Sequence, residues 1–313
     1  MSRALAVAES RSGAASPHLL PLLERLAGAQ VDGGALSDAT ASRRRALKIA
    51  VSAYGSTSTN AANAMIALAE LDILQHRYVD AEPLLIAATD VLSMRLGDNN
   101  PAMSAPLAAL ARIALARGEV SLARSRADRA NAVAARGAAL RSSEPLRVLG
   151  ATYAAEERFD EGERALRLAL ARDRRKTGDA SSETARSLAQ LANLLLRAQR
   201  FGEALPLIEQ AIAIDQAHLG ETHPLIADDF ADLGLTYVGL GRDTDAAAAL
   251  TYAITLLNRG AGRGTSRVAY AELELAGVLR RLGQTEDADA AFKDAKSILN
   301  DAAEDERLRE RQI

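Results

Sequence analysis

The sequence predicts an all-α fold built from about seven consecutive pairs of amphipathic helices. Small residues recur at nearly constant spacing along the 313 residues, and apolar positions fall at intervals of three, four and seven. Such intervals place side chains on one face of a helix. Composition agrees with this prediction, because 48% hydrophobic but only 3% aromatic residues suit closely packed Ala- and Leu-rich helices better than a β-sandwich.

The second helix of each predicted pair is marked by two small residues seven positions apart. The first of these small residues recurs at intervals of 42, with a single interval of 39, and its positions are Ala39, Ala81, Ala123, Gly162, Ala204, Ala246 and Ala288. A mostly apolar residue lies midway between the two small ones, as at Leu85 and Ile208. Small residues on facing helices let the backbones approach closely, and the large residues fill the remaining space.

The first helix of each pair is marked by a large apolar residue, a Leu three positions later and then a small residue. Examples are Leu23/Leu26/Ala27, Met65/Leu68/Ala69, Leu107/Leu110/Ala111, Leu146/Leu149/Gly150 and Leu188/Leu191/Ala192. Glycines recur where a helix would end in a left-handed cap, at Gly55, Gly97, Gly137, Gly178, Gly220 and Gly262. Pro101 and Pro224 follow such glycines and are expected to open the next unit.

At these positions the chain resembles a tetratricopeptide-repeat array, of the 42-residue type found in kinesin light chains and many bacterial proteins. The residues that carry the resemblance are Ala192, Ala204, Ile208 and Ala211 in one unit, Gly234, Tyr237, Ala246, Leu250 and Ala253 in the next, and the linker 218–224. The resemblance implies a right-handed α-solenoid over residues 19–300. Arg43 departs from the pattern, since it stands at an apolar position, and one unit is shorter by three residues.

The two ends of the chain are expected to differ from the array. Residues 1–18 are small and polar and predict a flexible segment, whereas 301–313 predict a charged helical extension that covers the last repeat with polar residues. No stretch is long and apolar enough for a membrane span, and the apolar run near Met1 is too short for a secretory signal, so a cytoplasmic location is expected.

Catalytic and metal-binding motifs are not evident. The chain has no Cys, and its four histidines (His18, His76, His218 and His223) do not form a His-Glu-x-x-His motif, so neither a metal nor another cofactor is expected. The glycine-rich segment 260–264 falls at a linker position and does not follow a strand, as a dinucleotide-binding loop would require. The clustered carboxylates Asp228, Asp229 and Asp232 are interpreted as a solvated helix face.

The resemblance further implies that the first helix of each pair lines the concave side and contributes the ligand contacts. In the middle units these positions hold Arg112, Arg147, Arg186, Gln190, Asn193 and Arg197. Guanidinium groups bind carboxylates in a bidentate manner, so one hypothesis is that this stretch binds an acidic peptide. The alternative is that these residues are ordinary solvated arginines in an Arg-rich protein.

The predicted function is that of a non-enzymatic scaffold or adaptor that binds a peptide or protein in its groove, and self-association is compatible with the sequence. One alternative is a regulatory sensor that compacts when it binds a peptide. Another is an RNA-binding solenoid, but a net charge of −3 and the variable groove positions do not favour nucleic acid.

Overall fold

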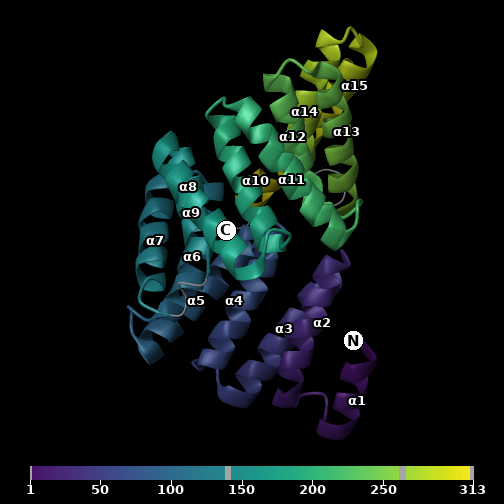
Figure 1. The fold of residues 1–313 in the computed structure, drawn as a ribbon. Coiled ribbons are helices and arrows are strands. Elements are labelled where there is room, and N and C mark those ends of the chain that lie inside the picture. The colour runs from purple at the N-terminus through teal and green to yellow at the C-terminus, as the bar shows by residue number, and fades with distance from the viewer. Residues whose placement is uncertain (1, 138–141, 261–265, 311–313) are drawn as a thin grey trace. The chain divides into compact units, whose positions relative to one another are not determined.

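Every regular element in the described part of the chain is a helix (Figure 1). The computed structural model describes the backbone of residues 2–137, 142–260 and 266–310, and side chains within 4–137, 142–259 and 267–300. The chain divides into two compact units, residues 1–176 and 177–313, which we call unit 1 and unit 2. The all-α stack of helix pairs is therefore confirmed.

Unit 1 contains four helix pairs preceded by a short helix. Its elements are α1 (Ser2–Ser12), η1 (Pro17–Leu19), α2 (Leu20–Asp32), α3 (Leu36–Tyr54), α4 (Thr59–Leu74), α5 (Tyr78–Leu96), η2 (Pro101–Met103), α6 (Ser104–Ala116), α7 (Val120–Ala134), α8 (Glu144–Ala155) and α9 (Phe159–Thr177). The first helices α4, α6 and α8 contact one another in succession. The first helices of successive pairs therefore stack on one another within this unit.

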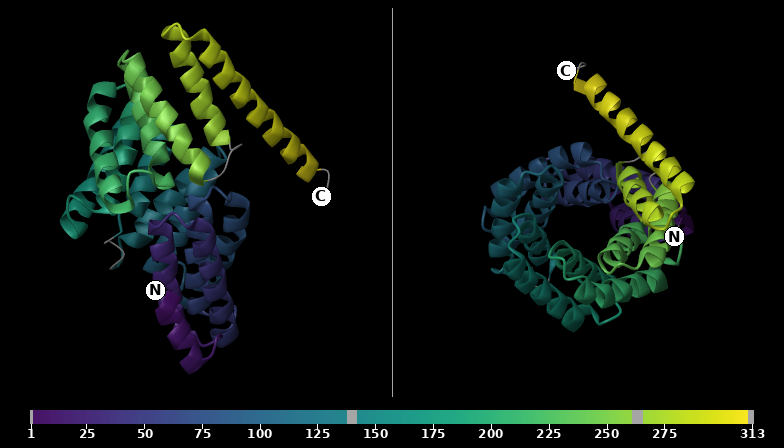
Figure 2. Two further views of the ribbon diagram at one scale, coloured as in Figure 1. Left: turned by 90° about the vertical axis from the view of Figure 1, so that its right-hand side faces the viewer. Right: turned by 90° about the horizontal axis from the view of Figure 1, so that it is seen from above.

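Unit 2 contains three helix pairs. Its elements are α10 (Ser182–Arg197), α11 (Phe201–Leu219), η4 (Pro224–Ile226), α12 (Ala227–Gly239), α13 (Asp243–Gly260), α14 (Ser266–Arg281) and α15 (Thr285–Glu310). The first helix α12 contacts both α10 and α14. The last two helices, α14 and α15, lie side by side and antiparallel (Figure 2).

Close approach within the pairs depends on the small residues that the sequence pattern singled out. Ala39, Ala81, Ala123 and Ala204 are fully buried. A Cβ atom on Gly150 would lie 2.4 Å from Cγ of Leu166, so α8 and α9 approach too closely for any larger residue there. The repeating small positions therefore fix the distance between paired helices.

The turn inside each pair contains a residue with positive φ, and the repeat pattern in the sequence does not reveal this feature. Glycine fills this position in four pairs, at Gly34, Gly118, Gly241 and Gly283. The other three pairs use His76, Glu157 and Gln199, whose φ angles are 57°, 59° and 58°. Residues other than glycine rarely adopt this conformation, so the turn inside each pair keeps the same backbone geometry even where glycine is missing.

The linkers between pairs agree only in part with the predicted left-handed caps. Gly55, Gly97, Gly178 and Gly220 have φ angles of 85° to 90°. The ψ angle of Gly55 is near 155°. That conformation is extended with positive φ and is almost restricted to glycine. Gly137 does not have positive φ, which corrects the prediction there, and Gly262 lies outside the described residues.

Prolines open new pairs as predicted. Pro101 and Pro224 each begin a short 3-10 turn that leads into α6 and α12. His223 precedes the second of these turns, and its Nδ1 accepts a hydrogen bond from the backbone N–H of Leu225 at 3.2 Å. Nε2 of His218 lies 2.6 Å from the carbonyl oxygen of Ala180. Both histidines thus have the linker role that the sequence predicts.

The N-terminal segment differs from its prediction. Residues 2–12, expected to be flexible, form α1. Leu5 and Ala8 pack on the cluster of Leu19, Leu23, Ala46 and Ile49, and Arg45 forms an ion pair with Glu9. A few apolar residues at helical spacing are thus sufficient to attach α1 to the first pair. At the other end, α15 continues to Glu310, while residues 311–313 of the predicted extension lie outside the described part.

Candidate functional site

Four polar residues form a stripe along one face of α10. Arg186, Gln190, Asn193 and Arg197 follow one another at intervals of four, three and four, so their side chains share a face. The two amides are partly buried in the middle of the stripe, and the two arginines are exposed at its ends. All four were predicted as groove residues, and the structure places them together.

Aspartates from the neighbouring helices lie beside the middle of this stripe. Nδ2 of Asn193 donates a hydrogen bond of 2.8 Å to Oδ2 of Asp232 on α12. Gln190 and Asp229 are separated by the same 39 residues as this bonded pair, so the register of α10 against α12 brings them to the same level. Asp215 of α11 interacts electrostatically with both Arg186 and Asp229. We call these residues, with the stripe, the α10–α12 site.

The aspartates of the α10–α12 site are strongly perturbed acids. Burial raises the pKa of Asp229 to about 8, and the charges of Asp215 and Asp232 contribute in the same direction. Burial also raises the pKa of Asp232 to about 6, against the lowering effect of the Asn193 hydrogen bond. The pKa of Asp215 is raised by burial too, opposed by the charges of Arg186, His218 and His223. Asp229 is therefore mainly protonated at neutral pH.

These carboxyl groups correct the interpretation of this cluster as a solvated helix face. Asp229 and Asp232 are only partly exposed, and Asp215 did not stand out in the sequence at all. Oε1 of Gln190 is buried and has no hydrogen-bond partner among the described residues. Destabilised polar groups of this kind concentrate at functional sites, which distinguishes the α10–α12 site from an ordinary polar surface.

The arginines at the ends of the stripe are available for a ligand. Neither Arg186 nor Arg197 forms an ion pair within the described residues, and both side chains are exposed. An α-helix rises about 1.5 Å per residue, so their Cα atoms are about 16 Å apart along α10. The site thus presents two cationic ends and a middle of amides and carboxyl groups.

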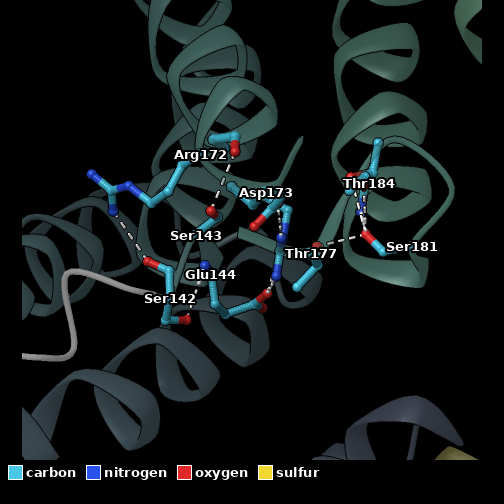
Figure 3. A network of polar contacts seen from close by, with 11 residues as sticks. Ser142, Ser143, Glu144, Arg172, Asp173, Thr177, Ser181 and Thr184 are labelled. Carbon is cyan, nitrogen blue, oxygen red and sulfur yellow. Dashed lines mark hydrogen bonds and ion pairs between the residues drawn. The ribbon is translucent and has the colours of Figure 1, made fainter. Parts of the chain in front are cut away.

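The two predicted groove residues of unit 1 form ion pairs with neighbouring side chains. Arg147 is 3% exposed and donates hydrogen bonds to Asp173 at 2.8 Å and to Glu144 at 2.6 Å. Asp173 and Glu144 lie in the polar network between α8 and α9 (Figure 3). Arg112 forms an ion pair with the same Glu144 at 3.3 Å. Arg147 is therefore a structural residue, and Arg112 is already neutralised by a neighbour.

The described residues give no support for a metal site or for a membrane-spanning helix. Within them no group of three or more His, Asp or Glu side chains is placed to hold a metal ion. None of the helices, over the ranges described, is both long and apolar enough to cross a membrane. The glycine-rich segment at 261–264 lies outside the described part of the chain.

Comparison with known proteins supports the repeat assignment directly. Residues 142–217 and 189–259 match the family model described as tetratricopeptide repeat. Residues 142–259 contain tetratricopeptide repeats. No curated protein matches the sequence.

Several solved structures are similar to this chain at low sequence identity. A Rap protein complexed with competence and sporulation factor is similar with a TM-score of 0.63 and 13% identity, over 91% of this chain and 79% of that one. BtubC (BKLC) from P. vanneervenii has a TM-score of 0.48 and 17% identity, over 86% and 92%. A Podosopora anserina structure described as kinesin light chain TPR-like repeats has 0.46 and 20%, over 64% and 96%. At these identities the similarity to the Rap protein shows the fold alone.

Proposed function

We propose that this tetratricopeptide-repeat protein is a scaffold that binds a peptide or protein segment along the α10–α12 site. The observation that carries the proposal is the stripe on α10, whose exposed arginines have no ion pair among the described residues, while Oε1 of Gln190 in its middle lacks a hydrogen-bond partner there and lies near the perturbed acid Asp229. Polar groups of this kind are stabilised more by a ligand that forms hydrogen bonds and ion pairs with them than by water alone.

The charges of the site suggest the chemistry of the partner. Arg186 and Arg197 favour carboxylates, which guanidinium groups bind in a bidentate manner. An extended peptide spans about 3.3 Å per residue, so the arginine spacing corresponds to acidic residues about five positions apart. Between them, Asp229 and Oε1 of Gln190 offer acceptors, which favours a segment that presents N–H or hydroxyl donors there. The proposed partner is therefore an extended segment with two separated acidic residues.

The fold is suited to this role because stacked repeats offer several contacts along a preformed surface. Many modest contacts together give a stable complex without a deep pocket. The Rap structure of similar fold holds competence and sporulation factor, which supports the proposal that such a stack can bind a separate molecule. Its low identity provides no residue-level support for the α10–α12 site.

Charge reversal at both ends of the stripe is expected to abolish partner binding. The double variant Arg186→Glu/Arg197→Glu replaces both attractive contacts by repulsion, with an expected loss of affinity of at least about a hundredfold. The measurement is affinity capture from native lysate, quantified by mass spectrometry against wild-type protein.

A matched control is Arg44→Glu/Arg136→Glu, which makes the same change of net charge at two exposed arginines of unit 1. A partner captured by wild type and by this control, but not by the α10 variant, is the predicted result. Equal capture by all three proteins would place the partner elsewhere on the surface and contradict the proposal.

A further inference from the structure

A second feature of interest is a groove in unit 1 formed by α2, α3 and α4. The groove has a volume of about 260 Å³ and opens to solvent. Its floor consists of small apolar residues from α3 and α4, namely Ala46, Ala50, Ala64 and Ala67. Arg43 of α3 lines the same groove, and Asn60 and Asn63 of α4 contribute amides to the lining.

Arg43 stands at a repeat position that elsewhere belongs to the core. The corresponding residues of the next five pairs are buried and apolar, and they are Leu85, Ala127, Leu166, Ile208 and Leu250. In the last pair the corresponding residue, Phe292, is apolar but 44% exposed. The last pair therefore resembles the first in having no buried residue at this position. The arginine therefore introduces a positive charge at a position where the next five pairs have an apolar side chain.

The guanidinium group of Arg43 has no described partner. The residue is partly exposed, and its guanidinium group forms neither a hydrogen bond nor an ion pair within the described residues, whereas the adjacent Arg45 is paired with Glu9. An arginine that lines an apolar groove and has no ion-pair partner can bind an anionic group there. The planar group that matches a guanidinium is a carboxylate.

We propose that this groove binds the side chain of a glutamate from a partner peptide. The carboxylate would pair with Arg43, the methylene stem would lie on the alanine floor, and the exposed amides of Asn60 and Asn63 would donate hydrogen bonds at the edge. The volume is below the range of about 300 to 1,000 Å³ typical of drug-sized ligands and suits a single side chain.

The carboxylate of Glu24 favours a peptide over a free dicarboxylic acid as the ligand of this groove. This side chain lines the same groove, is exposed and forms no ion pair with Arg43. It repels a second negative charge but accepts a hydrogen bond from a backbone N–H. A single carboxylate on a peptide therefore fits the groove better than a dianion. This site lies within unit 1, so the proposal does not depend on partner binding at the α10–α12 site.

The test is an NMR titration of the full-length protein with the peptide acetyl-Ala-Ala-Glu-Ala-Ala-amide. We expect saturable shifts of the side-chain amide signals of Asn60 and Asn63. The dissociation constant is expected to rise at least about tenfold for the same peptide with glutamine in place of glutamate. Free glutarate is titrated in parallel, and tighter binding of glutarate than of the peptide would overturn the assignment to a peptide side chain.

Two variants separate binding from folding. Arg43→Leu restores the apolar residue of the other pairs, so its Tm is expected to equal or exceed that of wild type while affinity for the glutamate peptide falls at least about tenfold. Arg44→Leu removes a neighbouring exposed charge outside the groove and should bind as wild type does. If Arg43→Leu is unfolded, Arg43→Gln replaces it with the same expected loss. Unchanged affinity in the Arg43 variant, or no saturable shift with the glutamate peptide, would overturn the proposal.

Discussion

Replacing Arg147 by methionine is expected to destabilise unit 1 by about 3 to 5 kcal/mol, because the buried carboxylate of Asp173 would lose its guanidinium partner. Arg147 and Asp173 are 3% and 2% exposed, and their bond measures 2.8 Å. Methionine approximates the length of the arginine stem, so the expected loss comes from the charge rather than from a cavity. The measurement is the free energy of unfolding in urea, followed by circular dichroism.

Arg112→Met provides the matched control for this experiment. Arg112 pairs with the same Glu144, but its side chain is 37% exposed, and exposed ion pairs contribute about 0 to 1 kcal/mol. Its loss should therefore change the free energy of unfolding by no more than about 1 kcal/mol. Equal destabilisation by the two variants would show that Arg147 is not a structural residue of the kind described.

Replacing Asp229 by asparagine is expected to stabilise unit 2 at neutral and alkaline pH. The folded state holds the pKa of Asp229 at about 8, whereas an unfolded aspartate titrates near 3.9. The folded protein therefore binds this proton more strongly. The associated stability is fully present below about pH 4 and is lost as the pH rises to about 8.

Asparagine keeps the shape of the protonated carboxyl group and cannot ionise, so the variant should lose most of this pH dependence. The expected gain at pH 8 is on the order of 5 kcal/mol, since the folded and unfolded pKa values of Asp229 differ by about 4 and each pKa unit corresponds to about 1.4 kcal/mol. Urea unfolding between pH 4 and pH 9 measures it. Asp228→Asn on the exposed side of α12 is the control. A wild-type stability that stays constant over this pH range would contradict the assigned burial of Asp229.

The sequence was sufficient to predict the helix pairs because their determinants are local and repeated. Fully buried small residues such as Ala81 and Ala204 occur at fixed spacing in helices, and one repeat supports the interpretation of the next. The turns with positive φ at His76, Glu157 and Gln199 could not be found in the same way, because these residue types rarely mark such a conformation.

The residues of the proposed site were predictable only as far as their helix face. Periodicity places Arg186, Gln190, Asn193 and Arg197 on one side of α10, but it does not indicate which partners other helices bring. Arg147 resembles a groove arginine in the sequence, and only the packing of α9 shows that Asp173 neutralises it. Asp229 resembles a surface acid for the corresponding reason, since its burial arises from the contact between α10 and α12.

The central claim is that the partner lies on the α10 face, and site-specific photo-crosslinking tests it most directly. A photoreactive phenylalanine derivative at Ala189, between the residues of the stripe, is compared with the same group at Ala213, an exposed position on α11. We predict that the partner is crosslinked from position 189 and not from position 213. Crosslinking from position 213 alone would contradict the claim and place the partner on the second helices of the repeats.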